Sequence, residues 1–256
     1  MVSTSDLYRE DKHLKARVED ACRLCERRGM ARFVGFLDAR EAMLAKGYIR
    51  QLQATCDAVF YGGHNDAERV MLGLFPEASD VDRASFPLAT LAFYYRKEAD
   101  ITHRDVLGSV IGCGVVREKI GDILCEEGRA IVFLHEDIAA FVAESLDKIG
   151  REGVKIEWPF MGEIHCVHHY RSVSGTVASP RLDAVLKVLL GISREQAARL
   201  IQSDVVSVNY VPTMSVSRTL IGGEVLSVKG YGRYIVDDVS AVSKKGRVIL
   251  SARQYV

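Results

Sequence analysis

The sequence has no long run of apolar residues. Its apolar runs, such as Ala139 to Ala143, fall far short of the roughly 20 residues that a membrane-spanning helix needs. The N-terminal segment is charged and contains no apolar signal core, so it gives no sign of export. We therefore expect a cytoplasmic protein that does not bind a membrane.

The chain also lacks net charge, because 34 Lys and Arg residues balance 34 Asp and Glu residues. The balance is uneven along the chain. Residues 180–256 contain 11 basic and 6 acidic side chains, whereas residues 1–179 contain 23 basic and 28 acidic ones. A small basic unit on an acidic body favours a polyanion-binding module attached to another domain.

The six cysteines are scattered along the chain, and most of them lie among apolar neighbours. In a cytoplasmic chain this predicts reduced, buried thiols.

The Cys22-x-x-Cys25 pair has no second pair at the spacing that a zinc site needs. A zinc site would need further ligands that the fold brings together, and the candidates are His165, Cys166, His168 and His169. Strand alternation places 165 and 169 on one side and 166 and 168 on the other. We therefore predict no metal site.

Composition excludes a disordered chain, since 48% of the 256 residues are hydrophobic and 27% are charged. The length predicts two or three domains.

We expect residues 1–80 to form an N-terminal mixed domain. The pattern predicts helices over 6–54, interrupted by an apolar break at residues 33–37. A short strand over 58–61 and a brief helix that stops at Pro76 complete the domain.

Residues 81–160 show the order β-α-β-β-α-β of a ferredoxin-like, RNA-recognition-motif-like domain. Thr102, with Asp105 at the capping-box position, predicts one helix start, and Asp137 predicts the other. The predicted strands cover 86–95, 122–125, 129–134 and 154–158. The third of them lacks paired stacking aromatics, because only Phe133 is available. A protein-contact or purely structural role is therefore as compatible with this domain as RNA binding.

Residues 161–179 resemble a strand followed by a Ser/Gly-rich linker. A third unit then begins at Pro180 with two helices, the second capped by Ser193 with Gln196 at the capping-box position. Short strands over 205–208, 225–228 and 234–236 follow. The predicted fold class is α+β throughout, with the third unit over 180–246.

The third unit resembles the S4-type RNA-binding domain over residues 180–236. The features that carry the resemblance are R-L-D at 181–183, S-R at 193–194, V-x-V-N at 206–209, G-G-E at 222–224 and V-K-G-x-G-R at 228–233. The chain departs from the pattern at Asp204, where Gly is usual. This predicts a looser turn, or an Asp with left-handed backbone.

The resemblance implies RNA binding, and the basic side chains fit it. Guanidinium groups bind phosphates in a forked geometry, and the second helix adds N–H donors at its N-terminus. The candidate RNA-binding residues are Arg181, Lys187, Ser193, Arg194, Arg199, Lys229 and Arg233. The alternative is a solvated basic face without a ligand.

R-L-D also occurs in pseudouridine synthases, where the Asp is catalytic. Only about 70 residues follow Asp183, and the small sheet accounts for most of them, so a catalytic domain has no room. We predict instead that Asp183 is a helix N-terminal charge paired with a nearby Arg. No catalytic residue is predicted.

Two further stretches resemble the YlmH-type bacterial proteins. They are F-Y-G-G-H-x-x-A-E-R at 60–69 and T-H-R-D-V-L-G-S-V-I-G-C-G-V-V-R-E-K-I-G-D-I at 102–123. That family joins an N-terminal and an RNA-recognition-like domain to an S4 domain, so the resemblance covers nearly the whole chain. It implies a non-enzymatic protein that binds large-subunit rRNA, with tRNA as a further ligand. It also implies a role in rescue of stalled subunits that carry peptidyl-tRNA, and a cell-division gene neighbourhood.

Within the second stretch, G-C-G-V-V-R at 112–117 imitates a dinucleotide fingerprint, but it follows a helix where a strand is required. We expect a helix end and a turn there, and no cofactor. Residues at the helix start and on that turn are secondary candidates for RNA contact or simply solvated charges, namely His103, Arg104, Arg117 and Lys119.

Two alternative functions stay open. One is an RNA-modifying enzyme that uses the S4-type unit for targeting, against which residues 1–179 show no nucleophile or cofactor motif. The other is a protein-interaction module linked to cell division. In the leading, ribosome-associated interpretation, the acidic N-terminal body is a candidate site for a protein partner or tRNA.

Overall fold

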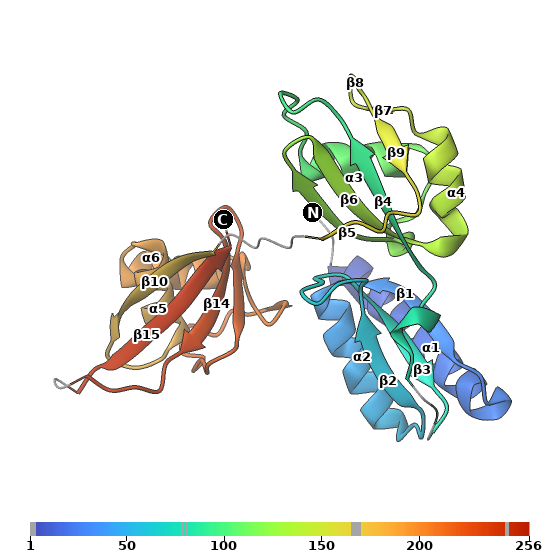
Figure 1. The fold of residues 1–256 in the computed structure, drawn as a ribbon. Helices are drawn as coiled ribbons and strands as arrows, with labels where there is room; N and C mark the ends of the chain where they lie inside the picture. The colour runs from blue at the N-terminus through green and yellow to red at the C-terminus, as the bar shows by residue number, and fades with distance from the viewer. Residues whose placement is uncertain (1–3, 78, 80, 165–169, 244–245, 256) are drawn as a thin grey trace. The chain divides into compact units, whose positions relative to one another are not determined.

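The computed structural model describes residues 4–77, 79, 81–164, 170–243 and 246–255. The chain divides into two compact units, Met1–Cys166 (unit 1) and Val167–Val256 (unit 2) (Figure 1). Each combines helices with antiparallel sheets, so the predicted α+β class is confirmed. Within the described residues, no helix has the length and apolar character needed to cross a bilayer.

The first part of unit 1 is a three-stranded sheet with helices on one face. Its elements are α1 (Thr4–Arg28), β1 (Arg32–Leu37), α2 (Ala39–Leu52), β2 (Asp57–Tyr61) and β3 (Val70–Phe75). The strand order is β1-β3-β2, with antiparallel pairing. Val18 of α1 and Ala45 of α2 pack against Leu72 and Leu74 of the central strand.

The second part of unit 1 has the predicted β-α-β-β-α-β order. Its elements are η1 (Arg83–Ser85), β4 (Leu88–Tyr94), α3 (His103–Gly112), η2 (Arg117–Lys119), β5 (Ile120–Glu126), β6 (Arg129–His135), α4 (Glu136–Ser145), β7 (Lys148–Ile149), β8 (Glu152–Gly153) and β9 (Lys155–Glu157). The strand order β5-β6-β4-β9 places the first and third strands of the motif at the centre. Thr102 caps α3 through the predicted capping box, but α4 is capped by His135 and not by Asp137.

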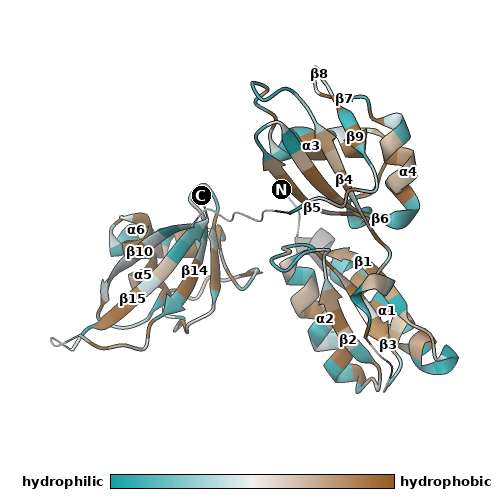
Figure 2. Ribbon diagram, viewed as in Figure 1, coloured by the Kyte–Doolittle hydropathy of each residue, from teal (hydrophilic) through white to brown (hydrophobic). Residues whose placement is uncertain are grey.

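Alternate residues of β4 and β6 enter two different cores. Phe93 and Val132 face α3 and α4. Ala92 and Phe133 point the other way and pack with Met71 of β3, so the two sheets meet face to face. Unit 1 is therefore built as helices, sheet, sheet and helices. Figure 2 shows the resulting apolar character of β4, β5 and β6.

Unit 2 is a six-stranded antiparallel sheet with two helices packed on one face, here called the inner face. The opposite face is called the outer face. The elements of unit 2 are β10 (Tyr170–Val177), α5 (Leu182–Leu190), α6 (Arg194–Gln202), β11 (Val206–Val208), β12 (Val211–Pro212), β13 (Val225–Val228), β14 (Gly232–Asp238) and β15 (Val248–Tyr255). The strand order is β10-β15-β14-β13-β11-β12. Leu186 of α5 and Ile201 of α6 are fully buried against Leu226 and Val236 of the sheet.

Two secondary-structure predictions in residues 1–80 are wrong. Residues 33–37, expected to be a break between helices, lie in β1, and the segment before Pro76, expected to be a brief helix, is β3. Both are short apolar runs, and periodicity alone does not separate a buried strand from a helical segment at that length.

The structure also corrects the limits of the C-terminal unit. The predicted linker over 161–179 contains β10, which pairs with β15 from Tyr170↔Tyr255 to Val177↔Val248. The sheet therefore continues beyond the predicted end at residue 246. Because the pairing partners are more than 70 residues apart, no local pattern in the Ser/Gly-rich segment reveals them.

Candidate nucleic-acid interface

Asp183 joins two arginines beside the N-terminus of α6. Arg181 Nε donates to Asp183 Oδ1 at 3.1 Å, and Arg194 Nε donates to Oδ2 at 2.6 Å. The carboxylate is buried, whereas the arginine side chains are 38% and 54% exposed. The predicted partnership of Asp183 with a nearby Arg is confirmed, with two arginines instead of one.

This cluster stays charged. Burial by itself would raise the pKa of Asp183, but hydrogen bonds from Arg194 and Arg181 outweigh it, so the pKa lies below its ordinary value. The same hydrogen bond raises the pKa of Arg194. The two guanidinium groups are thus oriented by one carboxylate, and their positive charge of two exceeds its negative charge of one.

The start of α6 adds polar groups to this cluster. Ser193 is the N-cap, and the predicted capping box with Gln196 is present: Ser193 Oγ accepts from Gln196 N at 3.1 Å. Lys187 is exposed in the last turn of α5. Arg199 is exposed but forms an ion pair with Glu195 one turn earlier, which reduces its net contribution to a positive surface.

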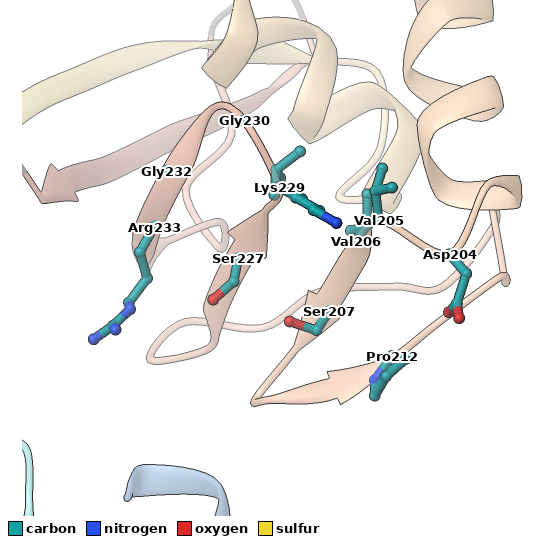
Figure 3. A pocket seen from close by; sticks show the side chains of 11 residues that line it. Asp204, Val205, Val206, Ser207, Pro212, Ser227, Lys229, Gly230, Gly232 and Arg233 are labelled. Carbon is teal, nitrogen blue, oxygen red and sulfur yellow. The ribbon is translucent and has the colours of Figure 1, made fainter. Parts of the chain in front are cut away.

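Lys229 and Arg233 lie elsewhere. Their neighbours Val228 and Tyr234 point into the core under α5 and α6, so alternation directs Lys229 and Arg233 to the outer face of the sheet. There they line an open groove of about 520 Å³ together with Ser207 (Figure 3). The seven candidate residues therefore do not form one surface, since tertiary packing divides them between the helix side and the outer sheet face.

The turns of the S4-like pattern are held by their own polar contacts. Asp204 adopts left-handed backbone with φ 57°, as predicted for an Asp in place of Gly. Glu224 of G-G-E is buried and accepts from Arg218 Nη2 at 3.0 Å and from Ile221 N at 3.0 Å. A Cβ at Gly222 would lie 2.9 Å from the backbone oxygen of Asp237, so a larger residue would not fit there. The G-G-E motif therefore determines the shape of this turn.

In unit 1, the two stretches that resemble YlmH-type proteins contact each other. Asp122, near the end of the second stretch, accepts from the backbone N–H groups of Glu68 and Arg69 at 2.8 and 2.9 Å. Its Oδ2 also lies 3.0 Å from Nε2 of His64. Gly63 has φ 97°, and a Cβ there would lie 2.5 Å from the Phe133 ring. These residues hold the two sheets together.

The secondary RNA-contact candidates have mixed surroundings. Arg117 Nη1 donates to the carbonyl of Ile120 at 2.6 Å, and burial lowers the Arg117 pKa to about 10, so its guanidinium supports the fold. Lys119 forms an ion pair with Asp137. His103 and Arg104 are exposed at the start of α3. Partial desolvation of the His103 ring and the charge of Arg117 lower the His103 pKa.

Phe133 does not serve base stacking in this arrangement, because it is fully buried between the two sheets. Cys22 and Cys25 are buried free thiols on α1. The other residues considered for zinc, His165, Cys166, His168 and His169, lie outside the described residues. In the part of the chain that the structure describes, no group of three or more His, Cys, Asp or Glu side chains is arranged to hold a metal ion.

Comparison with known proteins agrees with this architecture. Residues 82–161 match a family model described as "Putative RNA-binding domain in YlmH". The chain is 29% identical over 249 residues to a Bacillus subtilis protein, "Ribosome-associated protein quality control protein P2", with 95% of this chain and 96% of that protein covered. A solved structure, "Cell division protein ylmH from Streptococcus pneumoniae", shares the fold at a TM-score of 0.50 and 23% identity, over 58% of this chain and 90% of that one.

The fold and the matched domain define an α+β protein that contains an RNA-binding domain of the YlmH kind. More specifically, the chain is similar to the YlmH-type proteins, as the two sequence stretches indicated.

Proposed function

We propose that this chain is a non-enzymatic RNA-binding protein that associates with the ribosome and acts in ribosome-associated quality control in the cytoplasm. The observation that carries the proposal is the Asp183 cluster. It orients Arg181 and Arg194 beside the capped N-terminus of α6, where guanidinium and backbone N–H donors suit a phosphate. The name of the Bacillus subtilis relative supports the ribosomal setting.

In this proposal the bound RNA is rRNA of the large subunit, with tRNA as a further ligand in subunits that carry peptidyl-tRNA. Contacts of this kind position a protein by phosphate geometry and RNA shape and do not read sequence. The acidic body formed by unit 1 would then meet a protein partner or the tRNA. Such a brace requires no catalytic step.

Sedimentation of the tagged full-length protein with ribosomal particles tests the proposal. We expect co-migration with the large subunit at about 50 mM salt and loss of binding at about 200 mM salt, because phosphate contacts release counterions. Arg194→Ala should weaken the low-salt association. The matched control is Arg23→Ala, which also removes an exposed arginine paired with one carboxylate, but on α1.

Protein that remains at the top of the gradient at every salt concentration would contradict ribosome association. Binding that does not respond to salt would favour a protein-interaction module. The enzyme alternative makes a separate prediction: deletion of the gene would then remove a modification from rRNA or tRNA, which mass spectrometry of digested RNA detects. We expect the modification pattern to be unchanged.

A further inference from the structure

The outer face of the unit 2 sheet carries a cluster of aromatic and arginine side chains. Tyr170 of β10 and Tyr255 of β15 are register partners, with ring centroids 5.0 Å apart in an edge-on arrangement. The Arg253 guanidinium lies 4.9 Å from the Tyr170 ring centroid, and that of Arg233 lies 5.0 Å from the Tyr255 ring centroid. Two tyrosines are thus each paired with an arginine.

This cluster is continuous with the groove in Figure 3. Arg233 contacts Tyr255 and also lines the groove. From Arg233 the register continues through Ser227 on β13 to Ser207 on β11, which pairs with Pro212 on β12. Because serine side chains are small, they leave open space above this part of the sheet face. Figure 3 shows them on adjacent strands between Arg233 and Pro212.

The row from Tyr170 to Pro212 crosses all six strands. With neighbouring strands about 4.8 Å apart, it is about 24 Å long. Lys229 and Arg233 place positive charge along the groove. Arg253 lies beside Tyr170, but its charge is balanced by Asp237, whose Oδ1 lies 2.8 Å from Arg253 Nη2. Asp204 is the acidic residue at the groove's far end.

These features match the chemistry of single-stranded nucleic-acid binding. Such surfaces combine a basic groove that follows the backbone with aromatic rings on which bases stack, and arginine adds cation–π contacts. A duplex cannot use the rings in this way, because its bases are already stacked on each other. A length of about 24 Å suits a short site of a few nucleotides, near the lower end of known single-strand modules.

We propose that the outer sheet face of unit 2 binds a short single-stranded RNA segment, with bases on Tyr170 and Tyr255 and phosphates along Arg233 and Lys229. This inference rests on the proposed RNA-binding function, but it assigns a second surface, separate from the Asp183 cluster. The chain then holds structured RNA through the helix side and an unpaired strand through the sheet.

The test is fluorescence anisotropy of the full-length protein with a 5′-fluorescein-labelled ten-nucleotide oligouridine. Tyr170→Leu/Tyr255→Leu removes both rings but keeps apolar side chains, and we expect binding to weaken at least about fivefold, given the usual contribution of base–aromatic stacking. Tyr170→Phe/Tyr255→Phe should restore binding, because a ring suffices for stacking. The matched control is Tyr48→Leu, which removes a tyrosine that contacts Lys15 in unit 1.

Unchanged oligouridine affinity in the folded double Leu variant would overturn the proposal. If that variant melts early, crosslinking of the unaltered protein to 4-thiouridine-substituted oligouridine decides: adducts on the strands of the unit 2 sheet support the sheet face, and adducts confined to α5, α6 or unit 1 overturn it. The proposed ribosomal function is tested separately, by the salt-dependent sedimentation of the protein and of Arg194→Ala with the large subunit.

Discussion

Arg194 Nε lies 2.6 Å from Asp183 Oδ2, and the other oxygen of the same carboxylate accepts from Arg181. The two arginines are 13 residues apart in the chain, at the starts of consecutive helices. A single buried acid therefore fixes the orientation of two positive side chains before any ligand binds. Such preorganisation reduces the entropy that is lost on binding.

Arg194→Ala and Arg181→Ala should each weaken RNA binding about tenfold without unfolding the protein, the magnitude expected for one charge-assisted hydrogen bond. Each variant leaves Asp183 with one arginine, and both arginines are exposed to solvent, so we expect only a small loss of stability. Binding to purified large-subunit rRNA and a thermal melting curve give the two values. Unchanged affinity together with a normal melting curve would show that these side chains do not contact RNA.

Asp183→Asn should destabilise unit 2 by about 1–3 kcal/mol at pH 7, because a charge-assisted pair becomes neutral. The folded-state pKa of Asp183 is lowered, so its stabilisation is present above the unfolded-state pKa of about 3.9 and is lost as the pH falls through the folded-state value. The stability difference between the two proteins should therefore shrink below about pH 4. Urea titrations at several pH values measure it, and a constant difference would contradict this account.

Leu186→Asp should unfold unit 2, because Leu186 is fully buried between α5, α6 and the sheet. A charge placed there without a partner costs several kcal/mol. Loss of hydrogen-exchange protection confined to residues 170–255 would be the expected result. Lys187→Asp, at the next and exposed position, is the control and should keep the native protection pattern.

Gly63→Ala should destabilise unit 1 by about 2 kcal/mol or more, because the new methyl group would lie 2.5 Å from the Phe133 ring at a positive φ. Gly47→Ala is the matched control: Gly47 lies within α2 with open space around its Cα, so alanine should be neutral or stabilise by up to about 1 kcal/mol. Chemical denaturation compares them. Equal stability of the two variants would show that the two sheets do not pack tightly at Gly63.

The sequence by itself determined the local features of this protein. Capping boxes at Thr102 and Ser193, the left-handed turn at Asp204 and the β-α-β-β-α-β order all follow from residues within a few positions of one another. The Arg–Asp partnership at 181–183 is also a local signal. Such features need no knowledge of the rest of the fold, because each depends on one turn of backbone and its nearest side chains.

Only the tertiary structure decided which distant residues meet. Asp122 binds the backbone of Glu68 and Arg69 more than 50 positions away, and β10 pairs with the C-terminal strand. The same packing buries Phe133 and places Arg233 beside Tyr255, away from the helices of unit 2. The alternation within a strand shows that its two faces differ, but only the pairing and packing of whole strands determine what each face contacts.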